Sequence, residues 1–241
     1  ANVNDSLSCL YNANCITGAG NPYWLNDECY AWVISVDDYC CENEWDTICQ
    51  ATYDYCNGSW SGPLLSRVKN NKELNIAFTY AKKNNKPIHL IGLLSDGGIH
   101  SHDSHLIHLC KLADKAGVNN VYIHAFTDGR DCDPKSGVKF IEKLEKQTTK
   151  LSAELISVIG RYYAMDRDQR WERIKLAYDL MVHSKGEKSQ NIAEAVQNSY
   201  DKNTTDEFIE PICKVDNDGN PIAKIEEDNV VICFNFRTDR C

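Results

Sequence analysis

The chain has 241 residues, a formal net charge of −9 and 42% hydrophobic residues, enough for one large domain or two smaller ones. No apolar run approaches the roughly 20 residues that a membrane-spanning helix needs, and no signal peptide is visible. The acidic balance argues against nucleic acid as a partner, because phosphate backbones bind to basic surfaces.

Charge and cysteine content divide the chain into two parts. Residues 1–60 contain no Lys or Arg but hold seven of the 12 cysteines, whereas all 26 basic residues lie in residues 61–241. This asymmetry predicts a cysteine-rich module over residues 1–60, a junction over 61–71 and a second domain over 72–241.

The cysteines of the first part are Cys9, Cys15, Cys29, Cys40, Cys41, Cys49 and Cys56. So short a segment can bury little core, and disulfides are the usual means of stabilising one. A zinc site is the alternative, but the segment has neither a Cys-x-x-Cys pair nor a histidine. Seven is an odd number, so at most three disulfides can form within the module, and their connectivity stays open.

The sequence CCENEWDTIC, from Cys40 to Cys49, resembles a short CCxxxWDxxC motif of cysteine-rich modules in secreted bacterial proteins. Stable disulfides need an oxidising compartment, so the module predicts an extracellular or periplasmic location. Its aromatic residues could pack against the disulfides, or they could serve self-association or the binding of a surface or carbohydrate.

In the second part, apolar strands alternate with amphipathic helices. Apolar residues at helical spacing predict helices around residues 74–81, 106–113, 138–144, 174–181 and 192–196. Apolar runs predict strands over 87–94, 120–126, 155–159 and 229–236. This alternation predicts an α/β fold with a largely parallel sheet covered by helices.

A polar cluster follows each predicted strand directly. These clusters are SDGGIHSH after Leu94, TDGRDCDP after Phe126, GRYYAMDRD after Ile159 and RTDR after Phe236. Ligands of open α/β sheets bind beyond the carboxyl ends of the strands, so we expect these loops to converge. Their arginines could then bind a phosphate or carboxylate through charge-assisted hydrogen bonds. The alternative for the arginine-rich loop is a solvated, self-neutralising cluster. We favour an anion site in which Arg161 and Arg167 face the ligand, while Arg170 and Arg173 pair on the helix surface with Asp166 and nearby acids.

The histidines of the first loop admit two interpretations. His102 and His105 are spaced one helical turn apart, so together with His100 and His108 they could bind a metal ion. We favour the second interpretation, in which His100, after the flexible Gly97-Gly98 pair, acts alone as a donor or proton shuttle for the anion.

The motifs SDGGIHSH, TDGRD, GRYYAMDRDQRW and NFRTDR, in this order, resemble those of cofactor-independent phosphoglycerate mutase. The resemblance runs from about residue 64 to residue 241. It implies the phosphotransferase domain of a cytoplasmic glycolytic isomerase, a domain that the full enzyme carries inside a larger alkaline-phosphatase-like domain. By motif position it implies phosphoglycerate binding by His100, Arg130, Asp131, Arg161, Arg167, Arg237 and Arg240.

The same resemblance implies that essential groups lie elsewhere. The family's nucleophilic serine and its ligands for two Mn²⁺ or Mg²⁺ ions belong to the other domain, and the cysteine-rich module stands in place of part of it. We therefore expect no catalytic residue and no bound metal in this chain, and weak phosphoglycerate binding without isomerisation. Whether the chain is an enzyme stays open. The alternative is a secreted, non-enzymatic binding or structural protein that reuses the domain as a scaffold, and a fusion or fragment origin is also open.

Overall fold

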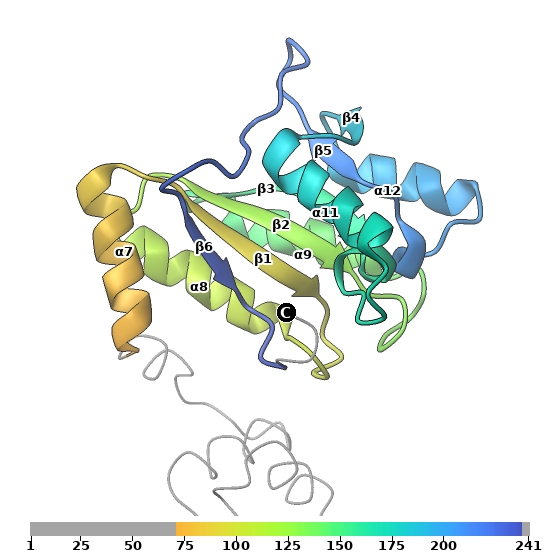
Figure 1. The fold of residues 1–241 in the computed structure, drawn as a ribbon, viewed down its shortest axis with the longest axis horizontal. Coiled ribbons are helices and arrows are strands. Elements are labelled where there is room, and N and C mark those ends of the chain that lie inside the picture. Colours follow the sequence, from red (N-terminus) through yellow and green to blue (C-terminus); the bar gives the residue numbers. More distant parts are fainter. Residues whose placement is uncertain (1–70, 238–241) are drawn as a thin grey trace, which may run out of the picture. The chain divides into compact units, whose positions relative to one another are not determined.

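The structure is a computed structural model that describes residues 71–237 (Figure 1). The predicted cysteine-rich module and its seven cysteines, most of the predicted junction, and Arg240 lie outside the described residues. In chain order the described elements are α7 (Lys72–Asn84), β1 (Ile88–Leu94), α8 (Asp103–Ala116), β2 (Val121–Thr127), α9 (Gly137–Thr148), β3 (Ala153–Gly160), α10 (Arg161–Ala164), α11 (Trp171–His183), β4 (Glu187–Ser189), α12 (Ile192–Asp201), the 3₁₀ helix η1 (Asp206–Phe208), β5 (Ile212–Lys214) and β6 (Val230–Cys233).

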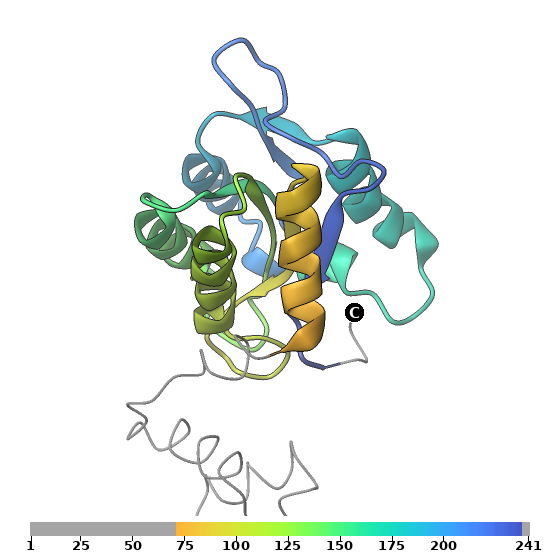
Figure 2. The same cartoon turned by 90° about the vertical axis from the view of Figure 1, so that its left-hand side faces the viewer.

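The strands form one six-stranded sheet in the order β4-β5-β3-β2-β1-β6. Every neighbouring pair is parallel except β3 and β5, which run antiparallel. Helices α8, α9 and α12 lie on one face and α11 on the other (Figures 1 and 2). The predicted α/β class, with a largely parallel sheet covered by helices, is therefore confirmed.

A single extra residue interrupts the pairing of β3 with β2. Leu155 pairs with Ile123, but the next pair along the strands is Ser157 with His124, so Ile156 has no partner position of its own. Such a β-bulge shifts the alternation of side chains between the two faces of a sheet. Beyond the bulge, Ser157 faces the same side as His124.

Packing under α11 fixes the carboxyl ends of the central strands. Leu93, Phe126 and Ile159, near the ends of β1, β2 and β3, form one buried cluster with Ala177 and Leu180 of α11. Full burial of each large aliphatic or aromatic side chain contributes about 1.5–3 kcal/mol. The loops that follow these strands therefore start from a rigid edge.

The final strand is shorter than its apolar run predicts. The sequence favours a strand over residues 229–236, whereas β6 spans Val230–Cys233. The ladder ends because the Asn235 side chain, rather than a main-chain carbonyl, accepts the hydrogen bond from the Leu93 amide at 2.9 Å.

Tyr178 of α11 also departs from expectation, since it belongs to the predicted apolar face of its helix but is 54% exposed.

Within residues 71–237, no helix combines the length and apolar character needed to cross a membrane.

Candidate functional site

The loops after β1, β2, β3 and β6 meet at the carboxyl edge of the sheet. A Cβ atom added to Gly97, after β1, would lie 2.8 Å from the main-chain oxygen of Asp131, after β2. The amide of Phe236, after β6, donates to the carbonyl of His100 at 2.8 Å. Arg161, after β3, donates to Asp131. The convergence predicted from the polar clusters that follow the strands is thus present.

Arg161 is the buried centre of this edge. It begins α10 immediately after Gly160, whose amide donates to the carbonyl of Ile209 at 2.7 Å, and only 4% of the arginine is exposed. Its Nη1 atom donates to Asp128 Oδ1 at 2.6 Å and to Asp131 Oδ2 at 2.5 Å. Burial disfavours the guanidinium charge, but its hydrogen bonds to the two carboxylates outweigh burial and raise the pKa of Arg161.

The two carboxylates around Arg161 carry one more charge than the guanidinium can neutralise. Burial opposes ionisation of Asp128, but hydrogen bonds from the Asp131 amide, Ser95 and Arg161 hold the pKa of its carboxyl below the ordinary value. Attraction for an anionic ligand must therefore come from other cations at the same edge.

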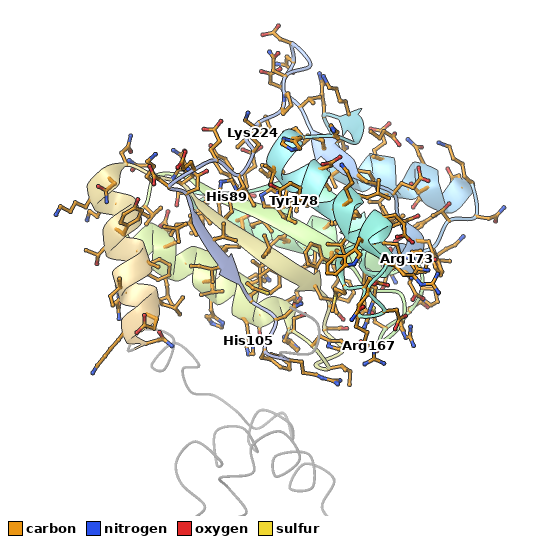
Figure 3. All side chains as sticks on the ribbon, in the orientation of Figure 1. His89, His105, Arg167, Arg173, Tyr178 and Lys224 are labelled. Atoms are coloured by element: carbon orange, nitrogen blue, oxygen red, sulfur yellow. The ribbon has the colours of Figure 1, made fainter. Side chains whose placement is uncertain are left out.

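The other predicted arginines lie on the surface around this centre. Arg130 is 60% exposed in its side chain, and its Nη1 atom lies 3.5 Å from Glu207 Oε1. Arg167, in the loop after α10, and Arg237, after β6, are also exposed. Figure 3 shows Arg167 and His105 at the same end of the sheet, with His89 and Lys224 toward the opposite end. Exposed guanidinium groups thus come from three of the four loops.

His100 is the histidine closest to the buried cluster. It is 4% exposed, and its Nε2 atom lies 3.7 Å from Asp131 Oδ2. His102 instead caps α8, with Nδ1 accepting from the Ser104 amide at 3.2 Å. Burial and the nearby His102 and His108 lower the pKa of His105 to about 4. Among residues 71–237, no group of three or more His, Cys, Asp or Glu side chains is arranged to hold a metal ion.

Arg173 interacts with residues of the arginine-rich loop itself. Its Nη1 atom donates to Asp166 Oδ1 at 3.1 Å, and its guanidinium lies 3.8 Å from the centre of the Tyr162 ring. The predicted pairing with Asp166 is confirmed for Arg173. Arg170 bonds to Asp166 through its main-chain amide at 2.9 Å, while the residue itself is exposed.

The sequence reasoning assigned no role to three acidic residues of the site. Asp128 lies inside the TDGRD motif, so its position next to Arg130 and Asp131 could have indicated a role. Asp206 and Glu207 come from η1, in a segment without a recognisable motif. Asp206 accepts hydrogen bonds from the amides of Ser136 and Gly137, each at 2.9 Å, and so holds the loop after β2. Glu207 contacts Arg130.

The structure is thus an α/β domain with a largely parallel sheet, whose carboxyl edge, where ligands of such sheets bind, carries a buried arginine–carboxylate cluster surrounded by exposed arginines. Residues 66–241 match the family described as BPG-independent PGAM N-terminus, and the chain belongs to this family. The resemblance inferred from the four motifs is thereby confirmed.

The names of similar proteins are consistent with the family match. The 2,3-bisphosphoglycerate-independent phosphoglycerate mutase of Flavobacterium psychrophilum is 63% identical over 169 residues, which cover 70% of this chain and 34% of the relative. The Parabacteroides distasonis enzyme of the same name is 52% identical over 173 residues, covering 72% and 34%. A crystal structure of Leishmania mexicana phosphoglycerate mutase at low cobalt concentration aligns with a TM-score of 0.69 and 30% identity, covering 73% of this chain and 34% of that one. The chain thus spans about a third of the length of these relatives.

Proposed function

We propose that residues 72–241 are the substrate-binding part of a 2,3-bisphosphoglycerate-independent phosphoglycerate mutase, which interconverts 3- and 2-phosphoglycerate. The observation that carries this proposal is the meeting of four motif-bearing loops at one sheet edge, in a chain of this family. Phosphoglycerate carries a carboxylate and a phosphate, and a guanidinium group can bind either of them through two parallel hydrogen bonds.

The predicted residues fall into two groups, the exposed arginines that would contact the ligand and the buried Arg161 that would position other residues. Arg130, Arg167 and Arg237 are exposed and supply the positive charge that meets the ligand, with Arg240 added by its motif position. Arg161 is held by two carboxylates, so its proposed part is to present Asp131 and His100 in fixed positions. Positioning and charge neutralisation provide most of the rate in phosphoryl transfer.

The binding proposal is tested by a pair of single substitutions in the arginine-rich loop. Arg167→Ala should weaken 3-phosphoglycerate binding by the full chain about tenfold or more in calorimetry, because a charge-assisted hydrogen bond is lost. Arg170→Ala removes the same charge from an exposed neighbour and should leave affinity within about twofold. Equal effects of the two substitutions would contradict a specific role for Arg167 and favour the solvated-cluster alternative.

We further propose that the chain alone does not isomerise phosphoglycerate. In the family a divalent metal acts as a Lewis acid and a serine accepts the phosphoryl group, and the motifs of this chain include neither function. Incubating the purified chain with 3-phosphoglycerate and Mn²⁺ should leave the substrate unchanged in ³¹P NMR spectra. Formation of 2-phosphoglycerate would refute this expectation.

The secreted-scaffold alternative rests on the seven cysteines of residues 1–60. The mutase assignment favours the cytoplasm, whereas disulfides would favour export. Thiol counting by mass spectrometry, with and without reductant, separates the two. Three disulfides confined to residues 1–60 would support export, and seven free thiols there would remove the argument for it.

A further inference from the structure

One buried carboxylate oxygen connects the two loops that carry Arg130, Asp131 and Arg161. Asp128 is 2% exposed. Its Oδ1 atom accepts from Arg161 Nη1 at 2.6 Å, from the Asp131 amide at 2.9 Å and from the Arg130 amide at 3.1 Å. The same atom therefore fixes the main chain at two predicted substrate-binding residues and the side chain of a third.

The contacts form a relay that ends at His100, which the motifs predict to bind the substrate. Asp128 Oδ1 and Asp131 Oδ2 bind the same nitrogen, Nη1 of Arg161. The position of that nitrogen therefore depends on Asp128, and it in turn fixes the carboxylate of Asp131. Asp131 Oδ2 lies 3.7 Å from His100 Nε2. A change at Asp128 should thus reach His100 without any direct contact between the two.

Burial makes this arrangement stiff rather than adjustable. Arg161 and Asp128 are 4% and 2% exposed, so water cannot replace a lost partner of either group. Guanidinium–carboxylate hydrogen bonds are strong and directional when both groups are ionised, as the lowered pKa of Asp128 favours.

We propose that Asp128 is a positioning residue of the phosphoglycerate site, which orients Arg161 and, through it, Asp131 and His100. This inference rests on the proposed function for the identity of the ligand. It assigns a role to a residue that the four motifs place beside the substrate-binding residues but not among them.

The first test observes the guanidinium itself in the full chain. The Arg161 guanidinium is buried and hydrogen-bonded to two carboxylates, which should restrict its rotation. Its Nη–H signals in ¹⁵N NMR spectra should therefore be resolved and exchange slowly. Asp128→Asn keeps an acceptor for the two amides but removes the charge, so these signals should broaden or collapse. The control, Asp133→Asn, makes the same charge change at an exposed position of the same loop and should leave them unchanged. Sharp Arg161 signals in Asp128→Asn would overturn the proposal.

The second test asks whether Asp128 affects ligand binding through Arg161. Asp128→Asn should weaken 3-phosphoglycerate binding about tenfold, and Asp133→Asn by less than about twofold. In an Arg161→Lys background the effect of Asp128→Asn should fall below about twofold, because coupled residues are not additive. An equal loss in both backgrounds would contradict a role exerted through Arg161.

The two tests separate failure of this inference from failure of the proposed function. If the unmodified chain does not bind 3-phosphoglycerate, the proposed ligand is wrong, and the NMR comparison still decides whether Asp128 orients Arg161. If the ligand binds but the Arg161 signals are the same in the unmodified chain and in Asp128→Asn, the positioning role is wrong and the ligand assignment stands.

Discussion

Arg161 differs from the other arginines of the site in what its removal should do to the fold. Arg161→Ala would leave Asp128 and Asp131 facing each other without a cation, and breaking a buried ion pair in this way lowers stability by about 3–5 kcal/mol. Arg167→Ala, at an exposed position, should change stability by less than about 0.5 kcal/mol. Urea unfolding of the two variants measures the difference, and equal stabilities would contradict the buried-pair description.

The motifs predicted which residues gather at the site but not how they pair. Residues such as His100 and Arg130 could be assigned to one edge because each follows an apolar strand. The burial of Arg161 between two carboxylates could not be predicted, because it depends on how the loop after β2 lies against the start of α10 in the folded chain. Glu207 could not be predicted either, since only the folded chain brings η1 next to Arg130.

At the scale of single elements, α9 lacks a capping residue of its own. Ser136 precedes the helix but makes no side-chain cap hydrogen bond. The cap comes instead from Asp206, whose carboxylate accepts from the amide of Ser136, from the amide of Gly137 at the start of α9 and from the Tyr200 hydroxyl. A distant segment thus satisfies donors that a helix start normally satisfies locally.

This cap predicts an unusually large effect of one substitution. Asp206→Ala should lower the free energy of unfolding by about 2–4 kcal/mol, because buried donors lose their acceptor. Asp201→Ala, an exposed position at the end of α12, should change it by less than about 0.5 kcal/mol. Chemical denaturation of both variants provides the measurement, and similar values would show that the α9 cap contributes little.

Long periodic elements were predicted well, whereas short ones were missed for a physical reason. The helices and central strands carry enough apolar residues to show their period. β4 consists of Glu187, Lys188 and Ser189, none of them apolar, and β5 has only three residues. Both become strands because pairing at the sheet edge supplies hydrogen bonds that their own sequences do not predict.

At the scale of the whole molecule, a buried polar chain crosses the sheet. Ser157 Oγ bonds to His124 Nδ1 at 2.7 Å, His124 Nε2 to His89 Nδ1 at 2.9 Å, and His89 Nε2 to Asn229 Oδ1 at 3.1 Å. Asn229 Oδ1 also accepts from the Glu226 amide at 3.0 Å. Since this oxygen can only accept, His89 donates to it, and both imidazoles can satisfy every bond while neutral.

Burial of these imidazoles should make the domain sensitive to acid. Burial lowers the pKa of His124 to about 3, with a contribution from the neighbouring His89, and burial also lowers the pKa of His89. Below pH 6.5 the unfolded chain binds protons at both histidines that the folded chain does not, down to about pH 3 in the case of His124, so stability falls as the pH falls. The slope should reach about 1.4 kcal/mol per pH unit for each histidine.

Urea unfolding at pH 7.5, 6.5, 5.5 and 4.5 should therefore show constant stability above pH 6.5 and a steady loss below it. A His89→Gln, His124→Gln variant should lose the part of this slope that these two histidines contribute and keep the part due to His105, even if it is less stable at every pH. The Asp128 carboxyl contributes little in this window, because a lowered carboxyl pKa costs stability only as the pH falls toward and below the unfolded value of about 3.9. A slope unchanged in the double variant would show that other groups are responsible.

The extra residue in β3 affects the packing of that strand separately from its register. Substituting Ile156 by another apolar residue of similar volume should keep the strand in place. Deleting its codon would place Ser157 directly after Leu155, and their pairs with His124 and Ile123 would then continue as a regular ladder, so that every later residue of β3 would keep its face of the sheet. Loss of this residue would therefore cost the packing of one buried side chain but would not change the register of β3.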